Sequence, residues 1–116
     1  MFRGLFGGSR FLKKMNPLME LYSYSKNSEK TYKELMALEP LARTKGEKAM
    51  FNLNRAGLLY DMYKYEEAAD VMREIPSINP EFDAQCAQMK TRIMAAMTRG
   101  EHLSLIHISH DICTAS

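Results

Sequence analysis

The chain has 116 residues and a mass of 13.3 kDa, which suits one compact domain with a radius of gyration of about 13 Å. Sixteen basic and fourteen acidic residues give a formal charge of +2, too small for a dedicated nucleic-acid-binding domain, and no apolar run approaches the ~20 residues of a membrane-spanning helix. Two cysteines, Cys86 and Cys113, are too few for a disulfide framework or a zinc site by themselves.

Residues 1–15 are predicted to form a basic amphipathic arm. Its basic residues are Arg3, Arg10, Lys13 and Lys14, and its large apolar residues, at roughly helical spacing, are Phe2, Leu5, Phe6 and Leu12. No acidic residue precedes Glu20, and this composition resembles that of a mitochondrial targeting segment. Two alternatives stay open: a frayed terminus weakened by its glycines, and an anchor that lies on an anionic membrane surface.

Residues 16–100 are predicted to be an all-α domain of short antiparallel helical hairpins. Asn16 followed by Pro17 is a helix-start signal for a segment that ends near Tyr24. Ser28 is the predicted cap of a second helix, which ends before Pro40. No strand pattern competes with these signals in this part of the sequence.

The third and fourth helices are predicted from the next signals along the chain. Thr44 and Glu47 have the spacing of a capping box, in which each side chain bonds the backbone of the other residue. A long helix is therefore expected to start there and to end near Tyr63. A fourth helix is expected from about Tyr65 until Pro76 stops it.

Asn79 before Pro80 repeats the start signal and predicts a fifth helix that ends at Gly100. Its apolar positions, at steps of three and four, are Phe82, Cys86, Met89, Ile93 and Met97. Cys86 is therefore expected to be a small buried hydrophobic residue rather than a nucleophile.

Residues 56–80 resemble a tetratricopeptide repeat. The matching positions are Ala56, Gly57, Tyr60, Tyr65, Ala68, Met72 and Pro80. The resemblance implies two antiparallel helices, in which Gly57 and Ala68 lack large side chains where the backbones approach. Residues 28–40 match the second helix of an earlier, degenerate unit, and the helix after residue 80 is expected to cap the repeat.

Departures from the repeat pattern predict dependence on a partner. The turn between the two helices is one residue shorter than usual, Pro76 interrupts the second helix, and Leu53 replaces an aromatic residue. Three or more repeats are normally needed for a self-sufficient solenoid, so a single degenerate repeat is expected to dock on a larger complex. The lysine and asparagine with which some members of the family hold a peptide carboxylate are absent, because Asn54 and Leu58 stand there.

Residues 101–116 are predicted to be an irregular tail. The helical pattern stops after Gly100, and the stretch LSLIHIS that follows resembles the translated read-through of a sequencing adapter, so a non-native origin of the tail is one interpretation. The tail contains four potential zinc ligands, His102, His107, His110 and Cys113. Their spacing matches no zinc module, and no metal site is predicted.

The sequence lacks clustered acids, bases and nucleophiles, so we predict a protein that is not an enzyme and needs no cofactor. The predicted function is that of a non-catalytic accessory or assembly subunit of a mitochondrial multiprotein complex, with an inner-membrane respiratory or ATP synthase complex favoured. Met62 and Met94, on second helix faces, are candidate interface residues. The alternative is a mitochondrial ribosomal or RNA-assembly protein, which the twelve basic and twelve acidic residues of the segment 20–99 disfavour.

Overall fold

The computed structural model describes the backbone of residues 9–115 and the side chains of residues 9–99. Within that range it contains no strand, and its elements are α1 (Arg10–Ser25), α2 (Ser28–Ala37), the short 3₁₀ helix η1 (Glu39–Leu41), α3 (Lys45–Asp61), α4 (Tyr65–Arg73) and α5 (Pro80–Ala115). The prediction of an all-α fold is confirmed.

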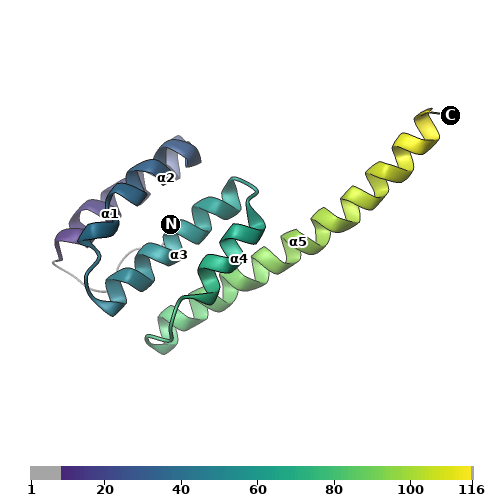
Figure 1. Cartoon of the computed structure of the whole chain (residues 1–116). Coiled ribbons are helices and arrows are strands. Elements are labelled where there is room, and N and C mark those ends of the chain that lie inside the picture. Colours follow the sequence, from purple (N-terminus) through teal and green to yellow (C-terminus); the bar gives the residue numbers. More distant parts are fainter. Residues whose placement is uncertain (1–8, 116) are drawn as a thin grey trace.

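Helices α1 and α2 form one antiparallel hairpin, and α3 and α4 form a second hairpin that packs against it (Figure 1). Helix α5 packs against α4 and extends beyond the other helices. The molecule measures 62 × 29 × 21 Å, and its radius of gyration is 16.8 Å. That radius exceeds the ~13 Å of a compact domain of this size because α5 projects from the bundle.

Helices α1 and α3 run parallel to each other. Three pairs of side chains join them, and the partners in each pair are 39 or 40 residues apart in the sequence: Phe11 with Phe51, Met15 with Asn54, and Tyr22 with Asp61. The two phenyl rings meet edge to face with their centroids 6.4 Å apart. Because this separation stays nearly constant from one pair to the next, both helices begin at the same end of the molecule (Figure 1).

Two of these pairs contain hydrogen bonds, one partly buried and one fully buried. The Tyr22 hydroxyl donates to Asp61 Oδ2 over 2.5 Å, and burial of Tyr22, together with this bond to a carboxylate, raises its pKa well above the usual value. Asn54 is fully buried, and its Nδ2 donates to the Met50 carbonyl over 3.0 Å and to Met15 Sδ over 3.5 Å. The bond to Met15 Sδ crosses from α3 to α1 and favours one alignment of the two helices. The Oδ1 atom of the same amide is buried without a hydrogen-bond partner among the described residues.

Helix α1 begins at Arg10 rather than at the predicted Asn16. The Ser9 hydroxyl oxygen caps it by accepting from the backbone N–H of Leu12 over 3.0 Å, and Pro17 lies inside the helix. An interior proline costs about 3 kcal/mol. The large side chains on both sides of the proline are buried: Phe11, Met15, Met19 and Tyr22. Burial of each side chain contributes roughly 1.5–3 kcal/mol, so that together they outweigh the cost of the proline.

The starts of α2 and α3 are both capped by side chains. Asn27, rather than the predicted Ser28, caps α2, because its Oδ1 accepts from the backbone N–H of Lys30 over 3.2 Å. The predicted capping box of α3 is confirmed. The Glu47 N–H donates to Thr44 Oγ1, and the Thr44 N–H donates to Glu47 Oε1, each over 3.0 Å.

Helix α4 ends at Arg73, before the predicted stop at Pro76. The predicted start of α5 is confirmed, because Asn79 Oδ1 accepts from the Phe82 N–H over 2.8 Å. The expected apolar stripe of α5 faces the bundle. Met97 is half-buried, and the other four residues of the stripe are buried: Phe82, Cys86, Met89 and Ile93.

Helix α5 continues through Ala115 instead of ending at Gly100. The backbone of residues 101–115, predicted to be irregular, is therefore helical. The physical reason is that one glycine destabilises a helix by only about 1 kcal/mol and keeps its backbone N–H donor. A proline would remove that donor, and no proline follows Pro80.

Replacing the buried Gly57 by leucine should lower the free energy of unfolding by about 1–3 kcal/mol, because the new side chain overpacks the interior of the second hairpin. Urea denaturation monitored by circular dichroism measures this change. The control is Gly46→Leu in the first turn of the same helix, where the site is half-buried and a smaller loss is expected. Equal stability of the Gly57→Leu variant and the wild type would mean that the helices leave room at this position.

Replacing Lys26 by glycine should raise the free energy of unfolding by about 0.5–1 kcal/mol. Lys26 ends α1 with a φ of 55°, and its N–H donates to the Tyr22 carbonyl over 2.9 Å. This left-handed conformation is strained for a residue with a Cβ atom and free of strain for glycine. Lys26→Ala keeps the Cβ atom, so a matching gain in that variant would contradict the explanation.

Candidate functional site

The residues that carry the tetratricopeptide resemblance lie in the α3–α4 hairpin, except Pro80, which is the first residue of α5. Tyr60 and Tyr65 are half-buried, and their ring centroids are 5.5 Å apart. The short turn between the helices places Tyr63 at a φ of 64°. The remaining residues of the set are all buried: Ala56, Gly57, Ala68 and Met72.

The residues predicted for the basic arm fall into two groups. Arg10, Lys13 and Lys14 lie on α1 with their side chains exposed, and Arg3 lies outside the described residues. Leu12, one of the apolar residues of the predicted arm, is 2% exposed and belongs to the core. The described end of the arm is thus packed against the rest of the protein.

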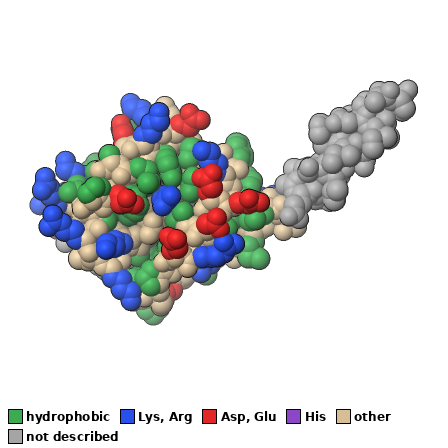
Figure 2. All heavy atoms as spheres, in the orientation of Figure 1, with side chains coloured by type: hydrophobic (Ala, Val, Ile, Leu, Met, Phe, Trp, Pro, Cys, Tyr) green, Lys and Arg blue, Asp and Glu red, His purple; other side chains and the backbone are tan. Residues whose placement is uncertain are grey.

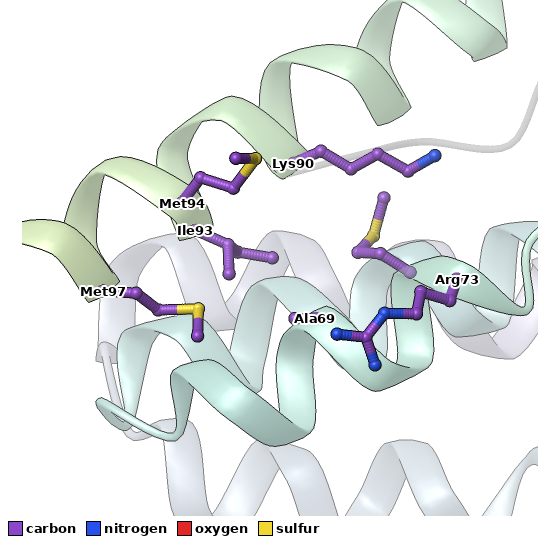
Figure 3. Close-up of a pocket in the computed structure, with 7 residues that line it drawn as sticks. Ala69, Arg73, Lys90, Ile93, Met94 and Met97 are labelled. Carbon is purple, nitrogen blue, oxygen red and sulfur yellow. The ribbon is translucent and has the colours of Figure 1, made fainter.

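An apolar groove lies between α4 and α5, with a volume of about 370 Å³. Met72 and Ile93 are buried at its base, and Met97 is half-buried. Figure 3 shows Ile93 and Met97 pointing from α5 toward Ala69 on α4. Met94 also lines the groove and is 68% exposed. Thioether side chains adapt their shape to irregular partners, so the groove suits an apolar helix face.

The groove has a cationic edge. Arg73 of α4 and Lys90 of α5 both line it and are exposed (Figure 3). Arg73 forms an ion pair with Asp70, one turn earlier in the same helix. Lys90 supplies a second positive charge across the groove. An apolar base with basic groups at the edge fits a ligand that combines apolar and acidic groups.

The small side chain of Ala69 explains why a hollow remains here. Ala69 of α4 faces the two large side chains of Ile93 and Met97 of α5 across the groove. Sequence reasoning identified Met94 as an interface candidate but missed Arg73 and Lys90. The periodicity of either helix by itself does not show that these two residues meet across a groove.

A second polar cluster joins the starts of α1 and α3. Glu47 is 6% exposed, and its Oε1 accepts from the backbone N–H groups of Arg43 and Thr44, each over 3.0 Å. These bonds, and one from the Ser9 hydroxyl, hold the pKa of Glu47 below its ordinary value of 4.5. Arg10 and Arg43 lie together beside this carboxylate at a small hollow of about 160 Å³.

Potential catalytic and metal-binding groups are scarce among the residues with described side chains. Cys86 is 7% exposed, and burial raises the pKa of its thiol, which favours the protonated, unreactive form. Residues 9–99 contain no group of three side chains able to hold a metal ion. The four tail residues considered as zinc ligands lie outside the described side chains. In the same described part, no helix has the length and hydropathy to cross a membrane.

No protein-family model, curated protein or solved structure matches this chain. The tetratricopeptide resemblance of residues 56–80 therefore stays a prediction from the sequence.

Stability should fall with acidity through protonation of Glu47. Because folding lowers its pKa, the carboxylate stabilises the protein fully above pH 4.5, and this contribution is lost as the pH falls through the lower folded value. Glu47→Gln should cost about 0.5–1.5 kcal/mol at neutral pH and flatten the decline below pH 4.5.

The measurement is urea denaturation at a series of pH values. Glu29→Gln, an exposed carboxylate in the first turn of α2, is the matched control and should keep the steep decline. An unchanged acid slope in the Glu47→Gln variant would contradict the assignment.

Proposed function

We propose that this chain is a non-catalytic accessory or assembly subunit of a mitochondrial multiprotein complex, and that it acts by helical protein–protein docking. The observation that carries the proposal is the groove between α4 and α5, which exposes Met94 next to an apolar base. A large exposed methionine at the edge of an apolar groove is typical of surfaces that bind partner helices.

The chemistry of the groove indicates the kind of partner element. Arg73 and Lys90 border the apolar base, so an amphipathic helix with carboxylates beside its apolar face complements both features. A basic helix would meet repulsion at the same edge. We therefore infer that the partner subunit contributes an acidic amphipathic helix.

The mitochondrial location rests on the N-terminal sequence. Residues 1–19 carry four basic and no acidic residues, as targeting segments do. Among them, Arg10, Lys13 and Lys14 are exposed on α1 and available to a receptor or an anionic surface. We favour a respiratory or ATP synthase complex of the inner membrane as the assembly that the chain joins.

Met94→Glu should detach the chain from its complex, because it places a negative charge where the acidic partner helix would lie. On native gels of mitochondrial membrane extract, the fraction of the tagged chain in a large band should fall about tenfold or more, as expected for a central interface residue. Lys90→Glu should weaken the association in the same direction.

The control is Leu21→Glu on α1, which changes another exposed apolar residue, 61% exposed, on a different surface. Thermal melting of each variant verifies that it folds like the wild type. Retention of the Met94→Glu chain in the large band, or equal loss from Leu21→Glu, would contradict docking through the groove.

A further inference from the structure

Basic side chains gather at the end of the molecule where α1 and α3 begin. Figure 2 shows Lys and Arg along this edge. The two segments that meet there, residues 9–15 and 39–48, contain six basic and two acidic residues, a net charge of +4 in a chain whose total is +2. All six basic side chains are exposed: Arg10, Lys13, Lys14, Arg43, Lys45 and Lys48. We call this surface the basic end.

Tertiary packing brings the two halves of the basic end together. Arg10 and Arg43 are far apart in the sequence, yet they border one hollow together with Leu41 and Glu47. Glu47 does not interrupt the surface, because it is 6% exposed and its carboxylate accepts hydrogen bonds from the backbone beneath. Lys13 and Lys14 stand three and four residues after Arg10, on the same outward side of α1.

We propose that the basic end is a docking surface for anionic phospholipid headgroups. Each basic side chain near an anionic bilayer strengthens binding by about fivefold, and six of them act within reach of one surface.

RNA is the other common polyanion, and the placement of aromatic residues argues against it. Single-stranded RNA is held by exposed aromatic rings that stack on bases, alongside basic groups. Phe11, the described aromatic residue nearest the start of α1, is fully buried. Tyr24 and Tyr63, which are 80% and 79% exposed, lie near the opposite ends of α1 and α3. The basic end therefore offers charge without a stacking surface.

This surface is separate from the groove between α4 and α5, so the inference does not depend on the proposed docking function. The groove is lined by residues of α4 and α5 alone. Helix α5 runs away from the basic end toward the C-terminus (Figure 1). Lipid contact at one end leaves the groove open to a partner subunit.

The test is flotation of the full chain with vesicles. Equimolar phosphatidylcholine and phosphatidylglycerol should bind it in a salt-sensitive manner, and pure phosphatidylcholine should bind it at least about tenfold more weakly. The double variant Arg43→Glu/Lys45→Glu changes only the half of the basic end that residues 39–48 supply. It should lower binding to the anionic vesicles about tenfold or more, with an unchanged thermal melt.

Lys30→Glu/Lys33→Glu is the matched control. It makes the same charge change at exposed sites of α2, and it should leave binding within about twofold of the wild type, since these sites lie outside the basic end. Equal loss in both double variants would reduce the effect to net charge and overturn the proposal. Normal vesicle binding by Arg43→Glu/Lys45→Glu would also overturn the proposal, because it would assign the contact to the N-terminal arm alone. Tighter binding of the chain to a uridine oligonucleotide than to the anionic vesicles would overturn it as well.

Discussion

The stacking of the two hairpins depends on the packing of α2 against α3 and on side-chain pairs that align α1 with α3. The Phe11 and Phe51 rings meet near the beginning of the two helices, and the Tyr22 hydroxyl reaches Asp61 near their end. Between them lies the buried Asn54 amide, which bonds Met15 of α1 and the backbone of its own helix. An apolar interface alone tolerates sliding, whereas a directional hydrogen bond across it favours one alignment of the two helices.

Both proposed docking surfaces follow from this stacking. Parallel helices place the starts of α1 and α3 together, which concentrates basic side chains at one end and leaves Tyr24 and Tyr63 at the other. The second hairpin in turn presents α4 to α5, and the small side chain of Ala69 leaves an apolar groove between them. A chain that holds an anionic membrane at one surface and an acidic helix at another would fix a partner subunit at a set position above the lipid. That role needs geometry and charge rather than catalytic groups.

Local signals predicted the starts of α3 and α5 correctly. The capping box of Thr44 and Glu47 and the start at Asn79 were correct because each side chain satisfies a backbone N–H that the helix leaves free. The prediction for Pro17 was wrong because burial on both sides of it exceeds the cost of one lost hydrogen bond. The end assigned to Gly100 was wrong because glycine weakens a helix without removing a donor.

The sequence by itself determined the all-α class, most helix starts, the buried stripe of α5 and the charge of the N-terminal segment. Each of these depends on local composition or on neighbours three or four residues apart. Only the tertiary structure decided that α1 runs parallel to α3, that Arg43 joins Arg10 at one end, and that Arg73 meets Lys90 across a groove. Each of these arrangements brings together residues that are far apart in the chain. Their pairing is set by how the apolar faces of the helices fit together, which the periodicity of a single helix does not specify.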